Sequence, residues 1–196
     1  MQSGKEVFVF MKRSIPQRSA APLTLRVTVA AALLAALSIV LGKYLAISLP
    51  TLRFSFENLP ILMAGILFGP VVGGTVGCLA DLVGCMMVGY EINPIITLGG
   101  TLVGVIAGLV PRLFPRRDTL SLRAWVLYLS VFLAHAVGSM TVKTIGMAIY
   151  YGTPTETLLW RIPLYLVIGA LEGGILHVLL RNRLIAGEIR RLLSSR

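Results

Sequence analysis

One acidic side chain stands out in this sequence because of its surroundings. Asp81 lies in the stretch RFSFENLPILMAGILFGPVVGGTVGCLADLVG (residues 53–84), whose second half is otherwise apolar and rich in glycine. An ionised side chain at the centre of a membrane-inserted helix costs about 3 kcal/mol, so such residues usually face a bundle interior or a cavity. Gly74, Gly77 and Gly84 fall on the same helical side as Asp81. The pattern predicts that Asp81 points into a helix bundle and marks a binding site.

The chemistry of a carboxylate predicts the kind of ligand. It accepts two parallel hydrogen bonds from an edge on which an amino group and a ring N–H point the same way, as in pterins and aminopyrimidines. We therefore expect a water-soluble ligand with such a ring and an anionic part. Aromatic side chains for stacking are Phe54, Phe56, Tyr90 and Trp160, and cations for the anionic part are Arg53, Lys143 and Arg161. An aromatic belt at the lipid headgroups and cations that snorkel to the membrane surface are the alternatives.

The composition determines which solvent surrounds the fold. Hydrophobic residues make up 56% of the 196 residues and charged residues 13%, and the mean hydropathy is +0.86. These values predict an integral membrane protein with room for about six spans of ~20 residues. Cys78 and Cys85 are seven residues apart on one predicted helix, too far to bond to each other, and we interpret them as packing residues. No spacing indicates a metal site, and we expect no metal and no cofactor.

Hydropathy along the chain predicts an all-α membrane protein of six transmembrane helices. The predicted segments are Pro22–Gly42, Phe56–Phe68, Pro70–Val88, Pro94–Val110, Leu122–Tyr150 and Leu158–Leu180. The second is short, and Gly69-Pro70 joins it to the third so tightly that the two must be antiparallel neighbours. We expect a cytoplasmic tail over residues 1–21, a six-helix substrate-binding domain over 22–182 and a basic cytoplasmic tail over 183–196. Translation could begin at Met1 or at Met11.

The distribution of basic residues predicts the orientation. Fourteen of the 18 lie in the N-terminal segment, in the loop between the fourth and fifth helices, or at the C-terminus. The positive-inside bias then places both termini in the cytoplasm. The other four, Lys43, Arg53, Lys143 and Arg161, fall at the outer level, where Asp81 is also expected. The separated basic clusters lack interleaved aromatics, so a nucleic-acid partner is not expected.

Two further groups of residues predict contacts between helices. Ala31 with Ala35 and Ala32 with Ala36 form AxxxA pairs, on which another helix, internal or from a partner protein, can dock closely. His135, Ser139 and Lys143 form a polar stripe with spacing i, i+4, i+8, which we interpret as a cavity wall. Glu172 and His177 are interpreted as interior packing or interhelical hydrogen bonds, and a change in Glu172 protonation is an open question.

The order of these parts resembles the substrate-binding S component of energy-coupling factor (ECF) vitamin transporters, and most closely the folate family. The residues that carry the resemblance are the alanine-rich first helix, RFSFENLPILMAGILFGPVVGG, the acid in ADLVG, and YEINP before ITLGGTLVGVIAGL. It covers roughly residues 25–180 and is most specific over 53–109.

The resemblance implies high-affinity capture of folate or a reduced folate outside a prokaryotic plasma membrane and its delivery inward. The energy would come from a transmembrane coupling subunit and two ATPase subunits, since this chain has no GxxxxGK[ST] phosphate loop. Residues 44–56 and 89–94 would be outer gates, and the alanine pairs would meet the coupling subunit. The expected substrate-binding residues are Asp81, Arg53, Phe54, Phe56, Tyr90, Asn93, Lys143 and Arg161.

Two alternatives remain open at this point. The first is an S component for another vitamin or aromatic metabolite. The second is an intramembrane enzyme, in which Ser139 with His135 or His177 would act as nucleophile and base. No GxSxG or HExxH motif accompanies these residues, so we expect no enzymatic activity.

Overall fold

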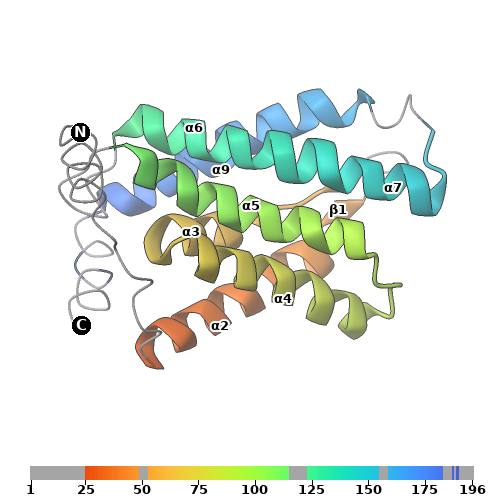
Figure 1. Cartoon of the computed structure of the whole chain (residues 1–196), viewed down its shortest axis with the longest axis horizontal. Coiled ribbons are helices and arrows are strands. Elements are labelled where there is room, and N and C mark those ends of the chain that lie inside the picture. The colour runs from red at the N-terminus through yellow and green to blue at the C-terminus, as the bar shows by residue number, and fades with distance from the viewer. Residues whose placement is uncertain are drawn as a thin grey trace, which may run out of the picture.

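A computed structural model describes residues 25–48, 53–114, 123–154 and 159–182, together with Gly187 and Ile189. The predicted tail over residues 1–21, the alternative start at Met11 and most of the tail over 183–196 lie outside the described residues. Six helical segments follow one another through the described part of the chain, and most run along the long axis of the molecule (Figure 1). Five are long and apolar enough to cross a membrane, and α3 is shorter. The all-α prediction is therefore confirmed, and the direction of insertion stays a prediction.

The first span ends in a π-helix and leads into a short hairpin. Helix α2 (Leu25–Ile39) continues as η1 (Val40–Tyr44), two residues beyond the predicted end at Gly42. Strand β1 (Ile47–Ser48) then pairs antiparallel with β2 (Arg53–Phe54), with Ile47 opposite Phe54. The hairpin lies within the segment predicted to be an outer gate.

Helices α3 (Asn58–Phe68) and α4 (Pro70–Val88) are joined by one glycine, as the Gly69-Pro70 sequence predicted. Gly69 adopts a φ of 109°, a region that residues with a side chain rarely adopt, and Pro70 follows at the first helical position, where its missing N–H has no cost. This turn allows the short α3 to pack back against α4. It also places the start of α3 near the C-terminal half of α4, where Asp81 lies.

The remaining spans are α5 and two long helices in the second half of the chain. Helix α5 (Pro94–Leu113) follows the loop after α4. Helix α6 (Ala124–Ala134), the π-helix η2 (His135–Val142) and α7 (Lys143–Tyr151) form one continuous span, and α9 (Arg161–Arg181) packs against α6 and η2. The long fifth segment of the prediction is therefore one helix with a π-helical middle.

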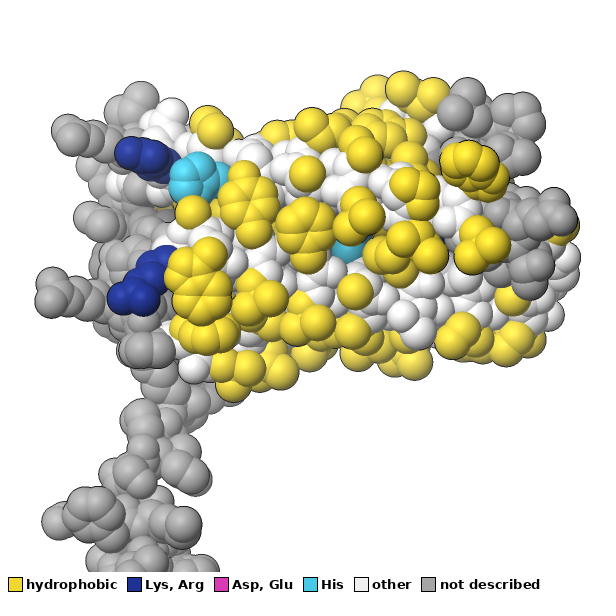
Figure 2. Space-filling model, turned by 90° about the horizontal axis from the view of Figure 1, so that it is seen from above, with side chains coloured by type: hydrophobic (Ala, Val, Ile, Leu, Met, Phe, Trp, Pro, Cys, Tyr) yellow, Lys and Arg dark blue, Asp and Glu magenta, His cyan; other side chains and the backbone are white. Residues whose placement is uncertain are grey.

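Glycines bring α4 and α5 closer than side chains would allow. A methyl group on Gly77 would overlap the carbonyl oxygen of Gly100, and one on Gly104 would overlap that of Gly73. The glycines of these two helices therefore face each other. Elsewhere, apolar side chains cover the outer surface, and Figure 2 shows them across the middle of one face. In a membrane protein this surface contacts lipid tails.

Candidate functional site

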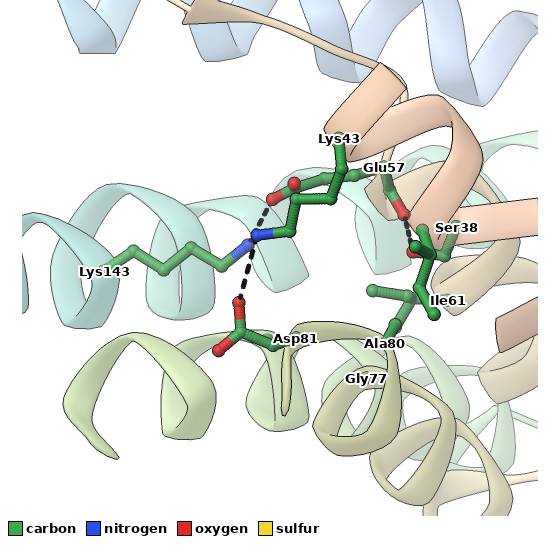
Figure 3. Close-up of a pocket in the computed structure, with 10 residues that line it drawn as sticks. Ser38, Lys43, Glu57, Ile61, Gly77, Ala80, Asp81 and Lys143 are labelled. Carbon is green, nitrogen blue, oxygen red and sulfur yellow. Dashed lines mark hydrogen bonds and ion pairs between the residues drawn. The ribbon is translucent and has the colours of Figure 1, made fainter. Parts of the chain in front are cut away.

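A pocket lies where α2, η1, α3, α4, α5 and α7 approach one another (Figure 3). Its enclosed space is about 10 Å³, roughly the room that one water molecule needs. Two carboxylates and two lysines belong to its wall, although they come from parts of the chain far apart in sequence. The lining residues are Ser38, Ile39, Lys43, Glu57, Ile61, Gly77, Ala80, Asp81, Gly100 and Lys143.

Asp81 is held in this pocket by a hydroxyl group and faces a lysine. Its Oδ2 accepts a hydrogen bond of 2.6 Å from Thr97 Oγ1, and its Oδ1 lies 3.9 Å from Lys43 Nζ. The Asp81 side chain is 14% exposed, so the pocket side of the carboxylate is not sealed by packing. Since Thr97 fixes one oxygen, the other is the natural acceptor for a group that replaces the Lys43 ammonium.

The second carboxylate pairs more tightly with its lysine. Lys143 Nζ donates to Glu57 Oε1 at 2.7 Å and lies 3.5 Å from Asn58 Oδ1. Ser38 on α2 donates a 2.6 Å hydrogen bond to the Glu57 carbonyl, which ties the turn before α3 to the first span. Both lysine side chains point into the space between Glu57 and Asp81 (Figure 3). Both carboxylates of the pocket are therefore paired with lysines. A charged group that binds here would have to replace a partner in one of these pairs.

Of the other predicted residues, Tyr90 lies beside a lysine of this pocket, whereas Phe54, Phe56 and Arg53 belong to the hairpin segment and do not line it. The Tyr90 ring is exposed, and Lys43 Nζ lies 5.7 Å from its centroid, within cation–π range. Phe54 and Phe56 pack edge to face with centroids 5.1 Å apart. The backbone of Arg53 pairs with Ser48 in the hairpin, and the Arg53 side chain lies outside the described part of the structure.

Two other predicted residues do not line the pocket. Asn93 is 3% exposed and caps α5, where its Oδ1 accepts hydrogen bonds from the backbone N–H groups of Ile95 and Ile96. Its amide also donates to the Gly146 carbonyl at 3.3 Å. The placement of Asn93 before Pro94 is itself a helix-start signal, so capping could have been predicted from the sequence.

Arg161 turns toward the middle of the bundle. Its guanidinium contacts the Met147 sulfur, lies 3.3 Å from the Tyr165 hydroxyl and 3.5 Å from the Ser139 carbonyl, and stacks over the Tyr165 ring. These contacts hold α9 against α7 and η2. Arg161 is therefore positioned to support the helices behind the pocket.

Three functional residues were missed or left without a role by the sequence analysis. Lys43 was predicted to lie at the outer level and Glu57 was given no role, and nothing local in the sequence shows that they pair with Asp81 and Lys143. Thr97 is a single hydroxyl in an apolar helix, a weak signal in itself. The available clue was the position of Thr97 near the start of α5, the helix that follows the helix of Asp81. Antiparallel neighbouring helices come together near the turn that joins them.

A second polar cluster lies deeper, between α3, η2 and α9. Asn58 Nδ2 lies 3.5 Å from Ser139 Oγ, which lies 3.4 Å from His135 Nδ1, and His135 Nε2 lies 2.7 Å from Glu172 Oε2. Ser139, His135 and Glu172 thus have the order of a hydrolase triad. All are at most 1% exposed, and none lines the pocket described above, so no substrate reaches the Ser139 hydroxyl in this conformation.

The sequence of this chain matches a known protein family. The sequence model of the family described as "ECF transporter, substrate-specific component" matches residues 26–185, most of the chain. The chain belongs to this family. It is a multi-pass membrane protein and an ECF substrate-specific (S) component, as the resemblance implied.

Individual relatives of this S component match less of its sequence. The folate transporter FolT of Clostridium novyi (strain NT) is 39% identical over 51 residues, 26% of this chain and 30% of that protein. A crystal structure of FolT bound with folic acid superposes with a TM-score of 0.64 at 20% identity, over 80% of this chain and 93% of the other. The structure of the S component of a bacterial ECF transporter gives 0.57 at 23% identity, over 81% and 94%. These two structures establish the shared fold.

The alanines predicted to dock a partner divide into two groups on α2 of the S component. Ala32 and Ala36 are exposed, Ala35 is 8% exposed in the core, and Ala31 is half-buried against it. The outward-facing pair is therefore Ala32 with Ala36, and Ala35 packs within the bundle.

Proposed function

We propose that this S component captures folate or a reduced folate at the outer side of a prokaryotic plasma membrane. The observation that carries the proposal is the Asp81 carboxylate, fixed on one oxygen by Thr97 and turned toward the pocket with the other. An amino group and ring N–H of a pterin can pair with both oxygens of this carboxylate, because Oδ2 keeps a second lone pair beside the hydrogen bond from Thr97. The partial sequence match to FolT and the fold shared with a folic acid complex support the same ligand class.

Binding requires Lys43 to leave Asp81, because a pterin edge and the lysine ammonium compete for the same oxygen. The pocket's enclosed space of about 10 Å³ is far below the ~300–1,000 Å³ of sites that hold drug-sized ligands, so the pocket must open for a ligand to enter. Lys43 lies on η1, directly before the hairpin β1–β2, so movement of this segment both frees Asp81 and enlarges the pocket. The released ammonium is then available for a carboxylate of the ligand's glutamate tail, together with Arg53.

We further propose that the S component delivers the ligand with a transmembrane coupling subunit and two ATPase subunits. The chain has no GxxxxGK[ST] loop for ATP phosphates, which supports a division of labour. The exposed Ala32 and Ala36 on α2 provide a small-residue face suited to close helix docking. No catalytic step is assigned to this chain.

Calorimetric titration of the purified protein in detergent tests the ligand. Folate, 5-formyltetrahydrofolate, thiamin and riboflavin are titrated side by side into wild type, Asp81→Asn and Asp118→Asn, the last a control carboxylate in the loop predicted to be cytoplasmic. We expect saturable binding of folates alone, lost in Asp81→Asn and kept in Asp118→Asn. Binding of a different vitamin would replace the substrate and keep the family, and no binding by a folded sample would refute the proposed site.

The enzyme alternative has a separate test. A reactive-serine probe added to the purified protein should leave Ser139 unlabelled, since its hydroxyl is fully buried. Stoichiometric labelling at Ser139, identified by mass spectrometry, would revive the hydrolase hypothesis.

A further inference from the structure

The cluster of His135 and Glu172 has no part in the ligand proposal, and its chemistry calls for an explanation. The two side chains meet at 2.7 Å in the middle of two membrane spans, with His135 1% and Glu172 0% exposed. Among the described residues, Glu172 Oε1 has no hydrogen-bond partner. A buried carboxylate oxygen without a partner is costly when the group is ionised.

The net charge of the pair determines how that cost is reduced. With a neutral imidazole and an ionised carboxylate, the pair carries one negative charge inside the membrane. With one more proton, shared between Glu172 and His135, the pair is neutral in total, which the hydrocarbon environment favours. The added proton comes from water, and no bond between heavy atoms forms or breaks.

Other charged and titratable groups near the pair are few among the described residues. From the elements packed against α9 they are Tyr128 on α6, Glu57 before α3 and Lys143 at the start of α7, and from α9 itself Arg161, Tyr165 and His177. Lys143 is already paired with Glu57 at 2.7 Å, and the Arg161 guanidinium contacts Tyr165 and Met147. No other cation in the described residues pairs with the Glu172 carboxylate, so His135 is its partner.

We propose that His135 and Glu172 form a proton-binding site, and that the proton bound there is linked to ligand binding through Ser139 and Asn58. The link rests on the proposed function, whereas the proton site stands without it. His135 begins the π-helix η2 and Ser139 lies within it, and π-helical turns occur frequently at functional sites.

Hydrogen-bond directions explain how the proton would be sensed. A neutral His135 that donates Nε2–H to Glu172 leaves Nδ1 as an acceptor for the Ser139 hydroxyl. A doubly protonated His135 must instead donate Nδ1–H to Ser139 Oγ. That oxygen also faces the Asn58 amide at 3.5 Å, so its hydroxyl hydrogen has to turn away. Protonation therefore reverses one bond in a short buried chain.

The chain ends at the ligand pocket. Asn58 contacts Ser139 through Nδ2 and Lys143 Nζ through Oδ1, both at 3.5 Å, and Lys143 lines the pocket with Glu57. A shift of the Asn58 amide thus alters how firmly Lys143 is held when an anionic ligand group approaches. By reciprocity, ligand binding alters the proton affinity of the His135–Glu172 pair by the same factor.

Infrared difference spectroscopy of the ligand-free protein tests the proton site. Spectra at two pH values should contain a carboxyl C=O or imidazolium band that titrates in wild type and disappears in Glu172→Gln and His135→Gln. His177→Gln removes the other histidine of the chain and should keep the band. A band unchanged in Glu172→Gln, or lost equally in His177→Gln, would overturn the site.

Calorimetry at several pH values tests the link. Ligand affinity in wild type should change by roughly 10-fold across the titration seen by infrared, a typical coupling between sites. Ser139→Ala keeps the His135–Glu172 pair, so it should retain the infrared band and lose that pH dependence. Retained pH dependence in Ser139→Ala would overturn the link. A titrating band in a protein that binds no folate would refute the proposed function and the link, and leave the proton site supported.

Discussion

At the scale of single residues, Asp81 depends on Thr97. The 2.6 Å hydrogen bond orients the carboxylate and leaves one oxygen for the ligand. A hydrogen bond to a charged group contributes about 1.5–3 kcal/mol, so Thr97→Val should weaken folate binding by roughly 10-fold or more. Calorimetry measures the loss. Thr101→Val is the matched control, because Thr101 lies one turn further along α5 and donates to the Thr97 carbonyl instead; an equal loss in both variants would contradict the role of Thr97.

Lys43 offers a second prediction at this scale. It lies 3.9 Å from Asp81 in the ligand-free pocket and becomes available for a ligand carboxylate after it moves. Lys43→Gln should therefore lower the affinity for folate relative to that for 6-hydroxymethylpterin, which has the pterin ring and no carboxylate, because loss of the competing ammonium at Asp81 acts on both compounds alike. Competition titrations with the two compounds measure this ratio. Equal effects on both would show that Lys43 does not contact the tail.

At the scale of elements, the contact between α4 and α5 depends on glycine. A methyl group on Gly104 would overlap the Gly73 carbonyl, and neither backbone can move without separating the helices. Gly104→Ala should lower the free energy of unfolding by about 1–3 kcal/mol, as for other overpacked sites. Thermal unfolding in detergent measures it. Gly174→Ala is the control, because the nearest atom to a new methyl group there is 3.9 Å away; a similar loss in both would contradict the packing argument.

The start of α5 separates two hypotheses about Asn93. The sequence analysis assigned it to ligand binding, whereas in the structure its side chain caps α5 and contacts the Gly146 carbonyl. Asn93→Ala should cost about 0.5–2 kcal/mol of stability. Asn93→Ser, which can still cap, should restore most of it, and folate affinity should change little in either folded variant. A large loss of affinity in Asn93→Ser without loss of stability would favour direct contact with the ligand.

At the scale of the whole molecule, the pocket and the proposed docking face lie on different surfaces. The pocket lies among α2, η1, α3, α4, α5 and α7, whereas Ala32 and Ala36 face outward from α2. Ala36→Leu should leave folate binding by the isolated S component unchanged and weaken its assembly with the coupling subunit and ATPases. Ala170→Leu, at an exposed alanine on α9, is the control. Copurification and uptake of labelled folate measure assembly, and normal uptake by Ala36→Leu would argue against this docking face.

Local signals in the sequence were enough to determine the elements of this protein. Hydropathy identified the spans, and Gly69-Pro70 identified the turn between α3 and α4, because both depend on residues that are neighbours in the chain. The glycines on the Asp81 side of the same helix likewise predicted a face turned into the bundle, and Gly77 now packs against Gly100 of α5. The position of Asp81 within an apolar helix pointed to a pocket for the same reason. A carboxylate in that setting must face the interior.

The tertiary structure alone decided which side chains meet. Asp81 with Thr97, Lys143 with Glu57, and His135 with Glu172 are pairs whose members are 16, 86 and 37 residues apart. Each pairing depends on the rotation and depth of helices that pack against one another, and no local pattern encodes these. The same dependence turned Arg161 toward Tyr165, away from the pocket. The sequence shows which charged side chains are available at a given level of the membrane, but only the packed bundle determines which of them pair with one another.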